Sequence, residues 1–259
     1  MRVVDLDRDM SDVIPTGTTL DSDFLFERMT SRTIALADPS PGRRVLDVAS
    51  GVGQDAVAMA REGAQVVGAE PSRRMLGMSD LLATEAGAVV PLWVQSWGDE
   101  LPFAPASFDA VICKGALDHF DRPLEAIREM ARVTRPDGRV VLAIANFESL
   151  SCRVGRALDH WSEDVMGRTS VRERRTYDCP SDHFTRYELG LMREQAEASL
   201  HLDVVEGISL AWGAPGWSRI VSRLPVNAAR ALLRAGNGLA QRFPELADVI
   251  VLAGRPRRD

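Results

Sequence analysis

The stretch VLDVASGVGQDA, residues 45–56, joins two patterns typical of different secondary structures. It begins as an apolar, β-branched run and ends where helical periodicity starts. Gly51 and Gly53 lie in the turn between them, where they permit a positive φ and leave no Cβ in the way of a ligand. Ala49 occupies a third turn position that also suits glycine, and we expect its methyl group to be tolerated if φ is negative there.

Outward from this turn, short β-branched runs alternate with helical stretches as far as residue 146. The expected strands cover residues 44–49, 64–70, 89–95, 108–114 and 139–146, and the expected helices cover 55–63, 72–86 and 123–134. A proline inside the third run indicates a strand at the edge of the sheet, and RPDG at 135–138 is interpreted as a turn. Such alternation predicts an α/β fold with a doubly wound, mostly parallel sheet.

The flanking segments are organised differently. Residues 21–37 are interpreted as a helix that Asp21 or Ser22 caps. Residues 147–184 have no strand period and predict an inserted helix with a charged loop. Beyond them we expect helices at 186–200 and 224–243 and strands at 201–210 and 247–256.

These patterns define one division of the chain. We expect an N-terminal helical cap at 1–40 and one domain over 41–259. Within that domain we expect a cofactor-binding core at 43–147, a helical insertion or lid at about 148–185, and completion of the sheet by 186–259.

Composition narrows the classes of function. The 259 residues carry a net charge of −6, which disfavours nucleic acid as a partner because phosphate binding depends on Lys and Arg. Cys113, Cys152 and Cys179 lie far apart, so we expect no disulfide framework and no metal. The N-terminal residues MRVVDLDRDM contain no apolar segment and no run approaches the length of a membrane span, so we expect a cytoplasmic protein without membrane insertion.

The turn at 45–56 and the next strand together predict a nucleoside site. Ligands of open α/β sheets bind beyond the C-terminal ends of the strands. Glu70 ends the next strand, 19 residues after Gly51, where an acidic side chain accepts hydrogen bonds from ribose hydroxyls. Asp55 at the start of the helix and the missing third glycine disfavour a pyrophosphate, and with it an NAD-dependent dehydrogenase.

Three segments together resemble the class I S-adenosylmethionine-dependent methyltransferases. They are VLDVASGVGQDA at 45–56, VVGAEPSRRML at 66–76 and the stretch from LPFAPASFDAVICKGALDHF to RVVLAI at 101–144. The chain is similar to the small-molecule branch with quinone-biosynthesis enzymes (methyltransferase type 11), over about residues 43–147. This resemblance implies a Rossmann-like seven-stranded sheet whose last strand is antiparallel.

The resemblance also implies which residues hold S-adenosyl-L-methionine. The positions that match are Asp47, Ala49, Gly51 and Gly53 in the first motif, Glu70 at the ribose, Pro71 and Ser72 beside the adenine, and Lys114 beneath the methionine part. Ala49 replaces the glycine usual in the family, and Trp97 replaces an aspartate that contacts the adenine amine. Asp99, Ser96 or a backbone carbonyl are alternatives for that contact, and Trp97 is alternatively an adenine platform or a packing residue.

His119 and His183 are the candidate catalytic bases. His119 follows the fourth strand with Asp118, and His183 precedes the first helix of the C-terminal part. For both histidines a structural role is the alternative. Three further groups are candidates for acceptor or cofactor contacts: Trp212 and Trp217 for an acceptor pocket, Phe24 and Phe26 for closure over the cofactor, and Arg172, Arg174 and Arg175 for a lid. For the aromatic residues the alternative is packing, and for the arginines it is a solvated face.

From these residues we expect methyl transfer from S-adenosylmethionine to a small-molecule acceptor. A catalytically inactive, cofactor-binding domain with a regulatory or assembly role is the alternative. The intact turn and Glu70 predict cofactor binding in both cases. Acceptor identity, the methylated element and the oligomeric state stay open.

Overall fold

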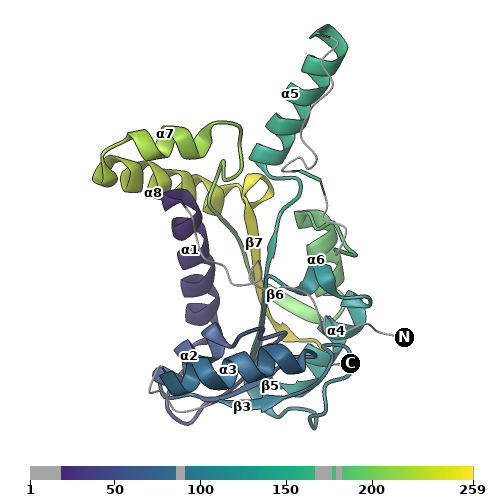
Figure 1. The fold of residues 1–259 in the computed structure, drawn as a ribbon. Helices are drawn as coiled ribbons and strands as arrows, with labels where there is room; N and C mark the ends of the chain where they lie inside the picture. The colour runs from purple at the N-terminus through teal and green to yellow at the C-terminus, as the bar shows by residue number, and fades with distance from the viewer. Residues whose placement is uncertain (1–18, 86–90, 167–176, 179–182, 259) are drawn as a thin grey trace.

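The computed structural model describes residues 19–85, 91–166, 177–178 and 183–258, and these form a central sheet with helices on both faces (Figure 1). The strands are β1 (Arg44–Val48), β2 (Gln65–Ala69), β3 (Leu92–Val94), β4 (Phe108–Lys114), β5 (Thr134–Ala145), β6 (Leu200–Ile208) and β7 (Val249–Pro256). Their order is β3-β2-β1-β4-β5-β7-β6. Among the described strands, β7 alone runs opposite to the other six, so the predicted doubly wound sheet with an antiparallel last strand is confirmed.

The order of strands reverses between β1 and β4, which pair in parallel with Val45 opposite Ala110. The chain winds outward from β1 through β2 to β3 and then returns to place β4 on the other side of β1. Loops that follow β1 and β4 therefore diverge from each other, and a crevice at this point is where open α/β sheets bind ligands.

The long helices are α1 (Leu20–Ala37), α2 (Gln54–Arg61), α3 (Arg73–Glu85), α4 (Pro123–Val133), α5 (Leu150–Met166), α6 (Leu189–Glu197) and α8 (Val226–Arg242). Apolar side chains of α1 and α2 share one buried cluster with Val45, Ala110 and Ile112. Those of α4 and α6 share another with Leu46 and Val111. Neighbouring residues of a strand point to opposite faces, so both faces of β1 and β4 are buried.

Several elements differ from the sequence prediction. Strand β5 begins at Thr134 and contains residues 135–138, which were interpreted as a turn, because Thr134 pairs with Phe108 before a register shift. Thr19, and not Asp21 or Ser22, occupies the N-cap of α1. The short helix α7 (Trp217–Arg223) was not predicted. Strand β3 lies at the edge of the sheet, as the proline indicated.

The N-terminal helix packs as part of the domain. Phe24 lies in a small apolar cluster with Val221 of α7 and Leu233 of α8. Phe26 stacks edge-on against Trp212, with ring centroids 6.3 Å apart. These contacts match the packing interpretation of the aromatic residues that were also candidates for closing over a ligand.

The inserted helix α5 projects away from the body of the sheet, in the region predicted to hold an inserted helix (Figure 1). Its role as a lid stays a prediction. The basic residues Arg172, Arg174 and Arg175 lie outside the described residues. Within the described ranges, no helix combines the length and the apolar character that crossing a bilayer requires.

Candidate active site

The turn after β1 is fastened to α2 by Asp47. Its carboxylate is fully buried and accepts a hydrogen bond from the backbone N–H of Ala56. Burial raises the pKa of Asp47 well above its usual range, and the charges of Asp55 and Glu70 raise it further. Asp47 therefore connects the end of β1 to the start of α2 through this hydrogen bond, as a turn-capping carboxylate does.

The two glycines of the turn serve different purposes. A Cβ at Gly51 (φ 54°) would meet nothing within 4 Å, so the backbone here is open to an approaching group. A Cβ at Gly53 (φ 78°) would lie 2.4 Å from the ring of Trp93, which also covers Gly68 at 2.3 Å. The close approach at Gly53 is thus made by an indole of β3, a residue that the sequence analysis did not single out.

Ala49 departs from our expectation. Its φ is +56°, in the left-handed region, whereas we expected an alanine to be tolerated on condition that φ is negative. A Cβ in this region crowds the following carbonyl oxygen and costs about 1–2 kcal/mol. The turn is therefore formed against a local conformational preference.

Glu70 connects the ends of β1 and β2. One carboxylate oxygen accepts the N–H of Gly51 at 3.0 Å and the other accepts the N–H of Ser72 at 3.0 Å. Ser72 in turn accepts the N–H of Met75 through its hydroxyl at 3.3 Å. A carboxylate at the end of the second strand of an open α/β sheet is the type of group that accepts hydrogen bonds from ribose hydroxyls.

The polar groups expected beside the adenine differ in whether they already have partners within the described part of the chain. Asp99 pairs with Arg122 at 2.7 Å, so its carboxylate already has a cationic partner. The buried hydroxyls of Ser50 and Ser96 make no hydrogen bond within the described part of the chain. The backbone N–H of Ser96 donates to the carbonyl oxygen of Glu70 at 3.3 Å, which brings this loop to the end of β2. Half-buried Trp97 follows directly.

These features fit an adenosine-bearing cofactor. The open backbone at Gly51, the carboxylate of Glu70 and the unpaired hydroxyl of Ser96 lie on loops that follow adjacent strands. All individual assignments to the cofactor stay predictions: Asp47, Ala49, Gly51, Gly53, Glu70, Pro71, Ser72, Trp97 and Lys114.

Lys114 and Asp55 form a buried ion pair at 2.8 Å, and Lys114 also donates to the hydroxyl of Thr30 in α1 at 2.6 Å. The expectation that Asp55 would present a repelling charge at the start of α2 therefore needs correction, because Lys114 compensates that charge. Lys114, expected beneath the methionine part of the cofactor, is committed to this contact between α1 and α2.

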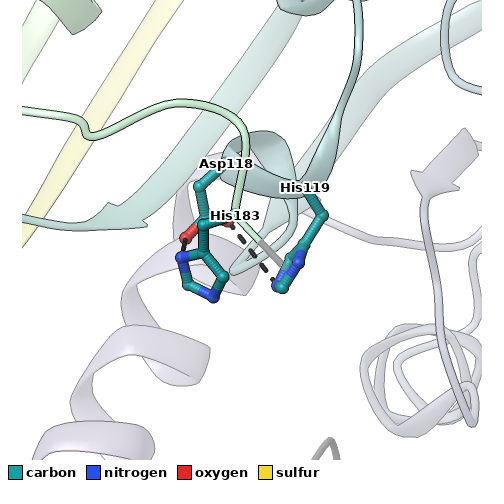
Figure 2. Close-up of side chains that lie close together, drawn as sticks. All are labelled: Asp118, His119 and His183. Atoms are coloured by element: carbon teal, nitrogen blue, oxygen red, sulfur yellow. Dashed lines mark ion pairs between the residues drawn. The ribbon is translucent and has the colours of Figure 1, made fainter. Parts of the chain in front are cut away.

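The structure brings the two candidate bases together at Asp118 (Figure 2). Asp118 and His119 lie on the short helix η1 (Leu117–His119) after β4, and His183 comes from the segment before α6. Nδ1 of His183 lies 2.8 Å from Oδ2 of Asp118, and Nε2 of His119 lies 3.9 Å from Oδ1. The two imidazole rings pack edge-on with centroids 4.2 Å apart.

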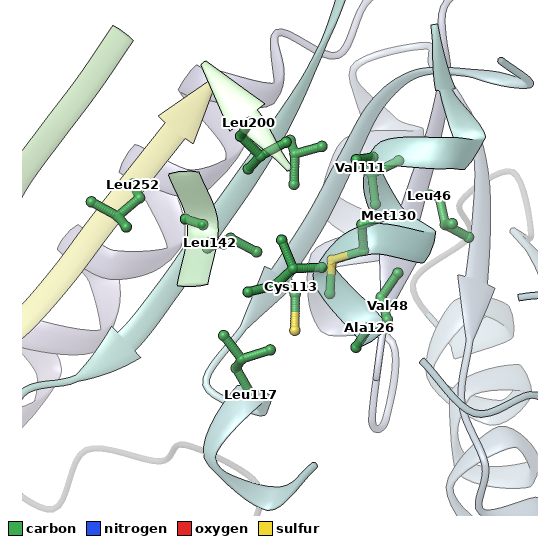
Figure 3. Packing of buried hydrophobic residues seen from close by; sticks show 14 of the residues in the cluster. Leu46, Val48, Val111, Cys113, Leu117, Ala126, Met130, Leu142, Leu200 and Leu252 are labelled. Atoms are coloured by element: carbon green, nitrogen blue, oxygen red, sulfur yellow. The ribbon is translucent and has the colours of Figure 1, made fainter. Parts of the chain in front are cut away.

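A rigid core supports η1. Cys113 and Leu117 are buried in the apolar cluster shown in Figure 3, together with Leu142 and Met130. Burial raises the pKa of the Cys113 thiol, so this cysteine is inert packing. The histidine cluster therefore lies on an element that packs against the buried apolar cluster.

A separate open cavity of about 700 Å³ lies between α1 and α2, with Phe26, Thr30 and Gln54 in its lining. None of the predicted cofactor residues lines it.

A reversed strand order with a nucleoside-type turn at β1 and an acidic residue at the end of β2 defines the class of α/β proteins that bind adenosine-bearing cofactors. Residues 46–142 match the family described as "Methyltransferase domain". This part of the chain is similar to a methyltransferase domain, and the resemblance to class I S-adenosylmethionine-dependent methyltransferases is confirmed for it.

Curated relatives match the same region. The uncharacterized methyltransferase YcgJ of Bacillus subtilis is 33% identical over 109 residues, which are 42% of this chain and 43% of the relative. The ubiquinone biosynthesis O-methyltransferase of Xanthomonas campestris pv. campestris is 40% identical over 106 residues, 41% of this chain and 44% of the relative. The matched region thus spans less than half the length of these relatives.

Solved structures extend the similarity of fold to most of the chain. The crystal structure of B. subtilis YcgJ superposes with a TM-score of 0.58 at 18% identity, over 90% of this chain and 99% of that one. The [4+2]-cyclase SpnF superposes with a TM-score of 0.58 at 20% identity, over 90% and 82%. A fold shared with a cyclase does not by itself define the reaction.

Proposed function

We propose that this chain transfers the methyl group of S-adenosylmethionine to a small-molecule acceptor. The observation that carries the proposal is the carboxylate of Glu70, which is held against the open backbone of Gly51. The relative named for ubiquinone biosynthesis supports an acceptor of small size. The net charge of −6 disfavours nucleic acid as the acceptor.

The chain's own residues would do two things in this reaction. Glu70 and the Gly51 backbone hold the adenosine at the ends of β1 and β2. The loop after β4 presents the histidine cluster at the neighbouring strand end, and the acceptor loses its proton there. S-adenosylmethionine supplies a methyl group already activated on a sulfonium, so alignment of the acceptor contributes most of the catalysis.

Calorimetric titration with S-adenosylmethionine, with NAD in parallel, tests cofactor binding. We expect saturable binding of S-adenosylmethionine alone, and a loss of at least about tenfold in affinity in Glu70→Gln, because hydrogen bonds to charged groups contribute about 1.5–3 kcal/mol each. Glu85→Gln is the matched control, because Glu85 is an exposed carboxylate at the end of α3. Equal weakening in both variants, or binding of NAD instead, would overturn the assignment of the cofactor.

The alternative is a cofactor-binding domain without turnover, and one observation favours it. Ala49 occupies a left-handed position in the motif where the resemblance implies glycine. Both functions predict binding, so only turnover separates them. A screen of phenolic, amine and carboxylate acceptors for S-adenosylhomocysteine release would distinguish them, and the absence of turnover beside intact binding would favour the alternative.

A further inference from the structure

The cluster after β4 offers three ligand atoms of the kinds that transition metals prefer. One carboxylate oxygen of Asp118 and one ring nitrogen each of His119 and His183 all lie within 4.8 Å of one another. Zinc binds imidazole nitrogen and carboxylate oxygen at about 2.0–2.2 Å, which places two tetrahedral ligands about 3.4 Å apart. The separations from the Asp118 carboxylate bracket that value: Oδ2 lies 2.8 Å from Nδ1 of His183, and Oδ1 lies 3.9 Å from Nε2 of His119.

The electrostatics of Asp118 favour a cation at this place. Its side chain is 4% exposed and its Oδ1 makes no hydrogen bond within the described ranges. His183 pairs with Oδ2 alone, so Oδ1 is a buried acceptor that a cation could bind. The nearby ammonium of Lys114 is committed to Asp55 and Thr30.

The backbone fixes the relative position of the ligands. The N–H groups of Phe184 and Thr185 both donate to the carbonyl oxygen of Asp118, at 2.8 and 3.2 Å. This clamp holds His183 against η1, although the two lie on distant parts of the sequence. The ring of Phe147 packs edge-on against His183 at 6.0 Å and restricts its orientation. Metal sites depend on such orientation of their ligands.

We propose that Asp118, His119 and His183 bind a divalent first-row transition metal ion, with a coordination position left open toward solvent. Two imidazoles and one carboxylate are a ligand set of zinc and of non-haem iron, and three protein ligands leave room for an exogenous oxygen. The side chain of His119 is 42% exposed, so the open position faces an accessible surface.

The consequence for the reaction rests on the proposed function. A hydroxyl of the acceptor binds the open position, and the metal lowers the pKa of that hydroxyl so that its proton passes to solvent. The resulting oxygen attacks the methyl carbon, and the electron pair of the broken carbon–sulfur bond returns to sulfur. One ether and one neutral thioether form from an anionic oxygen and a sulfonium, so charge is balanced. The site thus selects hydroxyl acceptors.

Metal binding is measured without turnover. The full chain is freed of metal with a chelator and titrated with Zn²⁺ by calorimetry, and Co²⁺ is added to a second sample to record its visible absorption. We expect one equivalent of Zn²⁺ with micromolar or tighter affinity, and a Co²⁺ band typical of four or five ligands. We expect His119→Ala and His183→Ala each to weaken Zn²⁺ binding by at least 100-fold.

His201→Ala is the matched control, because His201 is an exposed histidine on β6 outside the cluster. His119→Ala removes an exposed ring and keeps the proposal testable if His183→Ala fails to fold, as judged by circular dichroism. No binding of Zn²⁺, or binding that both cluster variants retain, would overturn the site. A protein that binds S-adenosylmethionine but no metal overturns only this inference, and one that binds metal but no S-adenosylmethionine overturns only the proposed function.

Discussion

Replacing Ala49 with glycine should stabilise the protein. Ala49 has a φ of +56°, where an L side chain costs about 1–2 kcal/mol. Glycine removes that cost, but it adds about 0.4–1 kcal/mol of conformational entropy to the unfolded chain. The difference predicts that the free energy of unfolding rises by about 0.5–1 kcal/mol.

The assay is denaturant unfolding of Ala49→Gly beside two control variants. Ala106→Gly changes an exposed alanine with a φ of +55° on a loop remote from the turn, so it should stabilise by a similar amount. Ala58→Gly lies inside α2 and should destabilise by about 1 kcal/mol. If Ala49→Gly destabilises as Ala58→Gly does, the conformational argument is refuted.

Three further predictions concern the turn, the buried ion pair and a buried acid. Gly53→Ala should lower the free energy of unfolding by about 2–4 kcal/mol, because overpacking against Trp93 adds to a strained φ. Gly51→Ala should lower it by only about 1 kcal/mol, because no atom lies within 4 Å of the added Cβ. Equal losses in the two variants would contradict the packing of Trp93. Lys114→Met should lower the free energy of unfolding by about 3–5 kcal/mol, because it leaves the Asp55 carboxylate buried without its cation. The double variant with Asp55→Asn should recover part of that stability in the same unfolding assay. No recovery would mean that the broken ion pair does not cause the loss. Burial raises the pKa of Asp248 to about 6, so the folded protein binds the carboxyl proton of Asp248 more tightly than the unfolded chain does. The free energy of unfolding should therefore fall as pH rises from about 4 to about 6, by about 1.4 kcal/mol per pH unit at most. Asp248→Asn should flatten that slope, and an unchanged slope would assign it to other groups.

The sheet could be predicted from the sequence because its strands are buried on both faces. Runs such as those at β1 and β4 have few polar residues, and their alternation with helices leaves few topologies. The turn predicted at 135–138 is assigned to β5, because RPDG lies between the pairs Phe108–Thr134 and Ala110–Arg139, where the register shifts. Local chemistry does not report such long-range pairing.

The site could be predicted only in part. Glu70 and the open backbone at Gly51 follow from spacing within one strand–turn–helix unit. The contact of Trp93 with Gly53 depends on how that unit packs against β3, and the left-handed φ of Ala49 opposes the local preference of an alanine. His119 and His183 were separate candidates, because 63 residues lie between them and no metal-ligand spacing connects them. The hydrogen bonds of the 184–185 backbone to Asp118 bring them together in the folded chain.

That clamp has a consequence for how the chain can diversify. The region shared with the methyltransferase family ends at residue 142, so it contains Asp118 and His119 but not His183. Exchange of the segment between β5 and α6 in evolution would keep the strands β1 to β5 and replace the imidazole of His183. Inheritance of the matched region and inheritance of His183 are thereby separable, and sequence identity over the matched region reports only the first.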